Sequence, residues 1–101
     1  MDVQIRWKDV PRSHHLEEHL ASRLRLVVGR LKERVTAVRV CFEDGVVKRC
    51  TIELEGALGR LRKEVRIHAE VHDTDLYVAA HRVADEIGRH MKAASILREY
   101  A

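Results

Sequence analysis

The chain has 101 residues, a formal net charge of +3 and no apolar run long enough to cross a bilayer. We therefore expect a single domain, residues 1–101, with one hydrophobic core and neither a signal peptide nor a transit peptide. Its two cysteines are too few for a disulfide scaffold and lack zinc-site spacing, so free thiols in a cytoplasmic protein are expected. The small positive charge permits a polyanionic partner without requiring one.

The first third of the chain predicts a strand followed by a helix. Apolar and polar residues alternate over residues 3–8, as in a strand with one buried face. Pro11 stops the strand, and Ser13 is a suitable helix cap. Gly29 costs about 1 kcal/mol relative to Ala inside a helix, so the last turn is expected to be loose. The apolar stripe of this helix runs to about residue 33 and consists of Leu16, Leu20, Leu24, Val27 and Leu31.

Three further strands are predicted from the same alternation, over residues 38–43, 50–55 and 64–71. Between the first two, Asp44 and Gly45 provide turn chemistry. Gly56 and Gly59 are predicted to bracket the next turn.

Residues 73–92 predict a second amphipathic helix. Asp73 or Thr74 can cap its first amides, and Asp75 suits the positive end of the helix dipole. Its apolar face consists of Leu76, Ala80, Val83, Ile87 and Met91. Its opposite face carries Arg82, Asp85, Arg89 and Lys92. Residues 95–101 are expected to be a frayed end or a short tail.

The resulting order, β-α-β-β-β-α, predicts an α+β fold like that of double-stranded-RNA-binding domains. Each predicted strand has one apolar face and each helix one apolar stripe. A four-stranded sheet with both helices packed on one face buries all of these surfaces at once. The other face of the sheet is expected to present mixed charges to water.

The order of elements and the segment RIHAEVHDTDLYVAAHRVADEI resemble the ribosome hibernation-promoting factor family, which includes the ribosome-associated inhibitor proteins. The N-terminal VQIRWKDVPRSHHLEEHLASRL resembles the first strand and helix of the family. Because the chain ends soon after the second helix, it resembles the short form, without the dimerisation domain of the long forms. The family has an alanine, then a run of an acidic residue, an aliphatic residue, Tyr, Ala and Ala, and then another acidic residue. This chain matches these positions with Ala69, Asp75, Leu76, Tyr77, Ala79, Ala80 and Asp85.

The resemblance implies a non-enzymatic protein that docks in the messenger and transfer RNA channel of the small ribosomal subunit and inhibits translation under stress. It implies ribosomal RNA as the partner, with no cofactor, no small-molecule substrate and no membrane. The implied RNA-binding residues are Arg82, Arg89 and Lys92 on the second helix and Arg23 on the first. Arg25 and Arg30 are added on charge alone.

Three positions depart from the family pattern and support an alternative. Family members usually carry a basic residue where this chain has Glu86, often another at Ala93, and a larger residue at Gly88. On charge alone, the helix surface could be an ordinary solvated face with i,i+4 pairs, Asp85 with Arg89 and Arg82 with Glu86. The alternative is therefore a divergent protein–protein interaction module of the same fold that no longer binds ribosomes.

Metal chemistry and catalysis are disfavoured. The run HLEEH at residues 15–19 matches the H-x-x-E-H spacing of inverted zinc proteases, but a third ligand and a cleft are lacking. His68, His72 and His81 are explained by outward-facing or flanking positions. Alternation places Cys50 inward and Cys41 on the exposed sheet face, where it is interpreted as a tolerated surface thiol. We predict neither catalytic nor metal-binding residues.

Overall fold

The computed structural model describes residues 2–58 and 63–100, with side chains described through residue 94. The predicted order of strands and helices is confirmed, with one short 3-10 helix added after the first helix. The elements are β1 (Asp2–Lys8), α1 (His14–Val28), η1 (Gly29–Arg34), β2 (Val35–Asp44), β3 (Lys48–Leu58), β4 (Lys63–Asp73) and α2 (Leu76–Tyr100).

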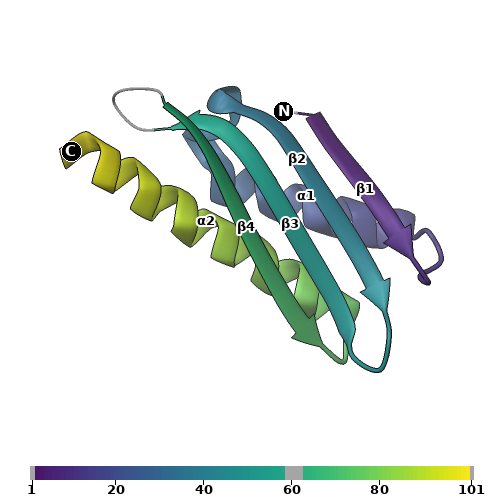
Figure 1. The fold of residues 1–101 in the computed structure, drawn as a ribbon. Helices are drawn as coiled ribbons and strands as arrows, with labels where there is room; N and C mark the ends of the chain where they lie inside the picture. The colour runs from purple at the N-terminus through teal and green to yellow at the C-terminus, as the bar shows by residue number, and fades with distance from the viewer. Residues whose placement is uncertain (1, 59–62, 101) are drawn as a thin grey trace.

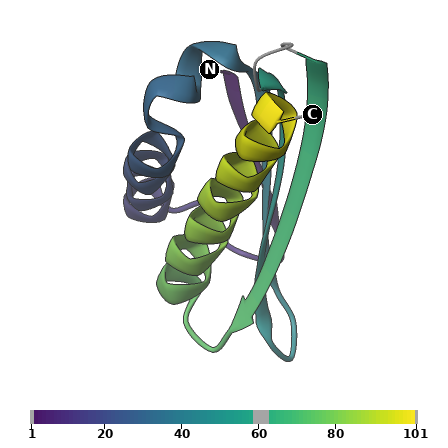
Figure 2. The same cartoon turned by 90° about the vertical axis from the view of Figure 1, so that its left-hand side faces the viewer.

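The four strands form one mixed sheet in the order β1-β2-β3-β4. β1 runs parallel to β2, which the intervening α1 makes possible, and the β2–β3 and β3–β4 pairs are antiparallel. Figures 1 and 2 show both helices on the same side of the sheet, with the other side open. The predicted two-layer architecture is therefore confirmed.

The core lies between the sheet and the two helices. Alternation along the strands sends one set of side chains into this layer, and Trp7 stacks on Phe42 there with ring centroids 4.8 Å apart. The fully buried strand residues include Val38, Phe42, Ile52 and Leu54, and the buried residues of α2 include Ala80, Val83, Ile87 and Met91. The opposite set of strand side chains faces outward and is largely charged.

The first helix is shorter than predicted because Gly29 ends it. Gly29 has φ = +53°, a left-handed conformation that costs little only for glycine, and its N–H donates to the carbonyl of Arg25. The chain then continues as η1, so the apolar stripe shifts. Val28 rather than Val27 is buried, and Leu31 packs against the core only in part.

The turn predicted from Gly56 is wrong, because Gly56 lies inside β3. It is buried opposite Val35, where β2 carries a bulge. A Cβ atom on Gly56 would lie 2.6 Å from the carbonyl oxygen of Arg34, so the close approach of two backbones requires glycine here. Gly59, the other residue of the predicted turn, lies outside the described residues.

The second helix begins later and ends later than predicted. Asp75 is its cap, since the Asp75 Oδ1 atom accepts a hydrogen bond from the Tyr77 N–H at 2.8 Å. Asp73 in turn accepts one from the Asp75 N–H at 3.0 Å. The helix continues through Tyr100, so residues 95–100 are helical rather than a tail. Among the described residues, no helix combines the length and the apolarity needed to span a bilayer.

Candidate nucleic-acid interface on the helix side

α1 and α2 lie side by side and run in the same direction, as their contacts show. His19 contacts Tyr77, Arg23 pairs with Asp85, and Val27 meets Gly88, so both residue numbers rise together along the line of contact. We call this line the helix seam. It lies between the two helices, which are drawn as coiled ribbons in Figure 2.

Gly88 lets the helices approach closely at the seam. A Cβ atom at this position would lie 2.9 Å from the Cβ atom of Val27, closer than real side chains come. The small residue noted in the sequence is therefore a packing requirement of this particular helix pair.

Asp85 lies at the middle of the seam and contacts residues of both helices. Its Oδ1 atom accepts a hydrogen bond from the Nε of Arg23 at 2.7 Å, and its Oδ2 atom lies 3.3 Å from His81. The hydrogen bond from Arg23 lowers the pKa of Asp85 and raises that of Arg23, although desolvation opposes both shifts. Asp85 thus pairs with the other helix and not with Arg89, the i,i+4 partner considered from the sequence.

Arg82 is likewise tied to an aspartate. Its guanidinium lies 3.4 Å from the Oδ2 of Asp73, the residue at the end of β4. The N–H of Asp75 lowers the pKa of Asp73 most, and the charge of Arg82 adds to the effect. Glu86, the partner considered from the sequence, lies 3.8 Å from His90.

The other predicted cations project into solvent. Arg89, Lys92 and Arg30 are exposed and form no ion pair with any described residue. Arg25 is exposed too, and its guanidinium donates to the Ser22 hydroxyl at 3.3 Å, which leaves its charge uncompensated. Of the six predicted RNA-binding residues, four are thus available to an anion and two are held by carboxylates.

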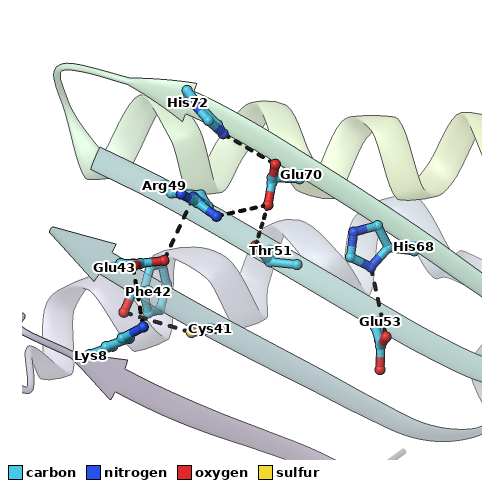
Figure 3. A network of polar contacts seen from close by, with 10 residues as sticks. All are labelled: Lys8, Cys41, Phe42, Glu43, Arg49, Thr51, Glu53, His68, Glu70 and His72. Atoms are coloured by element: carbon cyan, nitrogen blue, oxygen red, sulfur yellow. Dashed lines mark hydrogen bonds and ion pairs between the residues drawn. The ribbon is translucent and has the colours of Figure 1, made fainter. Parts of the chain in front are cut away.

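The open face of the sheet has the opposite character, because its charges pair across the strands. Figure 3 shows a chain of contacts across this face. Lys8 and Arg49 both lie near Glu43, at 3.5 and 3.6 Å, and Arg49 also reaches Glu70 at 3.4 Å. Glu70 continues the chain to His72 at 3.2 Å.

The remaining pairs extend this compensation toward the other end of the sheet. Arg39 contacts both Glu53 and Glu55, and Arg66 lies 3.2 Å from Glu55. The hydrogen bond from Arg39 holds the pKa of Glu55 below its usual value. Among the described residues, the cations on this face other than Arg6 are consequently matched by neighbouring carboxylates.

The charge of the two layers differs accordingly. The helical elements α1, η1 and α2 contain nine Lys and Arg residues against six Asp and Glu residues, whereas the four strands contain seven against eight. An incoming polyanion is therefore attracted to the helix side.

The residues considered for metal or thiol chemistry are dispersed. His14 contacts Glu18 at 3.1 Å, and His68 lies 3.8 Å from Glu53 on the other side of the molecule. Within residues 2–58 and 63–94, no three His, Cys, Asp or Glu side chains come together as a metal site. Cys50 is buried, which raises its pKa to about 12, whereas Cys41 is half-exposed on the open face, as predicted.

Comparison with known families gives a match over almost the whole chain. A family model described as sigma 54 modulation protein / S30EA ribosomal protein matches residues 3–95. The chain belongs to this family. The family resemblance seen in the sequence is thereby confirmed, and the matched residues include the helix seam and most of α2. A search of curated proteins gives no match.

Two solved structures share the fold of this S30EA family member. A ribosomal subunit interface protein from Coxiella burnetii superposes with a TM-score of 0.74 at 14% identity, covering 93% of this chain and 97% of the other. The N-terminal domain of Protein Y from Thermus thermophilus gives 0.72 at 18% identity, covering 93% and 99%. At such low identity, the likeness establishes the fold alone.

Proposed function

We propose that this protein is a non-enzymatic ribosome-associated factor that binds the small ribosomal subunit through its helix side and inhibits translation under stress. The observation that carries the proposal is the contrast between the two surfaces. Among the described residues, Arg89, Lys92, Arg25 and Arg30 form no ion pair on the helix side, whereas most cations of the open sheet face are paired with carboxylates. Membership of the S30EA family and the likeness to a ribosomal subunit interface protein support the same partner.

The physical basis of binding is the attraction of exposed cations for phosphate groups. Each Lys or Arg that neutralises a phosphate releases condensed counterions, so affinity falls steeply with salt. Arginine can also hold a phosphate through two parallel hydrogen bonds. Folded ribosomal RNA offers phosphates on a fixed surface, and a rigid pair of helices presents the cations at fixed positions.

The test is co-sedimentation of the purified protein with small ribosomal subunits over a series of salt concentrations. Replacing Arg82, Arg89 and Lys92 with alanine should weaken binding and flatten the salt dependence. The slope of log affinity against log salt should fall by roughly 0.7–0.9 for each phosphate that the variant no longer neutralises.

A variant with the same loss of charge on the open face is the matched control. Replacing Arg6, Lys8 and Arg66 with alanine removes three cations from the open face, and binding should stay near the wild-type level. An equal decrease in affinity for both variants would show that only net charge matters. If the helix variant binds small subunits as tightly as the wild type, the helix side is not the binding surface.

The alternative, a protein–protein interaction module of the same fold, draws on two features of the helix side. Arg23 is neutralised by Asp85, and Glu86 stands on the outer surface of α2. Fractionation of starved cells separates the two hypotheses. Ribosome binding places the protein in the small-subunit fractions at low salt, whereas the alternative leaves it outside the ribosomal fractions at every salt concentration.

A further inference from the structure

A cluster of exposed rings lies at the seam, near the beginning of α2. Tyr77 and Val78, in the first turn of α2, remain 43% and 41% exposed. His19 of α1 and His81 of α2 complete the group, which surrounds an apolar depression of about 290 Å³. We call this depression the ring cleft.

The three rings are held in place by contacts on the protein side. His19 meets Tyr77 edge to face with centroids 5.6 Å apart, and it lies 6.1 Å from the His81 ring at an interplanar angle of 30°. Asp85 anchors His81, and the capping hydrogen bond of Asp75 fixes the backbone of Tyr77. The cleft is therefore preformed, so binding of a ligand would cost little ordering entropy.

The surroundings of the ring cleft favour an anionic ligand with a flat ring. Arg82 and Arg23 lie one helical turn beyond Val78 and His19, but both are paired with aspartates, so the attraction for an anion comes from the wider helix side. The helical layer as a whole carries excess positive charge. A nucleotide combines a ring that stacks on aromatic side chains with a phosphate that arginine attracts.

We propose that the ring cleft receives an unpaired nucleobase of RNA, stacked on Tyr77 and the flanking imidazoles. This proposal rests on the proposed function, since it names the element of ribosomal RNA that the helix side would recognise beyond phosphate. The cations would then bind the phosphates of any RNA surface. The ring cleft would add specificity for a site where a base is unstacked.

The first experiment measures ribosome binding of Tyr77→Ala, Tyr77→Phe and a control, Leu26→Ala. Loss of one base stack should weaken binding by roughly 5- to 100-fold. The Tyr77→Phe variant keeps the ring and should bind like the wild type. Leu26 is 72% exposed on α1, so its removal deletes a comparable apolar side chain elsewhere on the helix side and should leave binding unchanged.

The salt series distinguishes stacking from charge. Tyr77→Ala should lower affinity at every salt concentration with an unchanged slope, whereas loss of cations changes the slope. If the wild type binds and Tyr77→Ala binds equally well, the base-stacking proposal fails while the proposed function stands. If the wild type does not bind ribosomes, the proposed function fails.

The second experiment identifies what occupies the cleft. Azidophenylalanine at position 77 preserves an aromatic ring and crosslinks to its neighbour when the ribosome complex is irradiated. A crosslink to a base of small-subunit RNA supports the proposal, and a crosslink to a ribosomal protein overturns it. Independently of the ribosome, a single-stranded RNA containing 2-aminopurine should lose fluorescence on binding to wild-type protein and not on binding to Tyr77→Ala.

Discussion

Asp85 links several properties of the molecule at the scale of a single residue. It joins α1 to α2 through Arg23, anchors His81 of the ring cleft, and neutralises one of the cations predicted to bind RNA. The sequence gives no local sign of this role, because Arg23 lies 62 positions away while Arg89 stands at the familiar i,i+4 spacing. Only the packing of the two helices decides between these partners.

The contact between Arg23 and Asp85 should make stability depend on acid. Because the pKa of Asp85 is lower in the folded protein than in the unfolded chain, its contribution is complete above about pH 4 and is lost as the pH falls through the folded value. Asp85→Asn should be less stable than the wild type at pH 6, and the difference should shrink toward pH 2–3. Urea unfolding at a series of pH values measures this, with Glu86→Gln as a control expected to show little change. A constant difference across the series would contradict the assignment.

Gly56 gives a second prediction for a single residue. Alanine in a strand is ordinarily favoured over glycine, but here its Cβ atom would collide with the backbone of Arg34. Gly56→Ala should destabilise the protein by about 1–3 kcal/mol, the usual cost of overpacking. Gly45→Ala is the matched control, since the nearest atom to its Cβ would be 3.8 Å away. Equal midpoints of urea unfolding for the two variants would refute the role given to Gly56.

At the scale of elements, alternation and helical periodicity predicted the number, type and order of strands and helices. These patterns work because each strand buries one face and each helix one stripe. They failed at glycines. Periodicity includes Gly29 in a helix that Gly29 in fact ends, and turn composition assigns Gly56 to a turn although it lies in a strand. The hydrophobic pattern contains no information about φ angles or about how closely two backbones approach. Most cations of the candidate site were named from the family resemblance, and only Arg25 and Arg30 from charge. The carboxylate partners of Arg82 and Arg23 were not predicted.

The close contact of α1 and α2 can be tested at Gly88. Leucine there has higher intrinsic helix propensity, yet it would force the helices apart at Val27, so Gly88→Leu should lower stability by about 1–3 kcal/mol. Ala93→Leu places the same side chain at an exposed position of the same helix and should change stability by less than about 0.5 kcal/mol. Thermal unfolding of both variants provides the comparison. A Gly88→Leu protein as stable as Ala93→Leu would show that the seam tolerates a larger residue.

For the whole molecule, the proposed function depends on the difference between a largely compensated sheet face and a partly uncompensated helix face. Asp85 limits this difference, since a phosphate that reaches Arg23 must compete with the carboxylate. Replacement of Asp85 by asparagine should therefore strengthen binding to small subunits and steepen the salt dependence by roughly one neutralised phosphate. Co-sedimentation at fixed pH measures the change, and Glu53→Gln on the open face is the control. Weaker binding by Asp85→Asn would mean that the pair positions Arg23 instead of blocking it.

The parallel pairing of β1 with β2 has a consequence for the order in which the chain folds. Val3 pairs with Val38 across a loop that contains all of α1, whereas β2, β3 and β4 join through short connections. Closing the longer loop costs more entropy, so we expect the three-stranded meander to form first and β1 to dock last, once α1 provides a surface for it. Pulsed hydrogen exchange during refolding would then show amides of β3 protected before those of β1. The N-terminal strand would also be the first to open in the native protein.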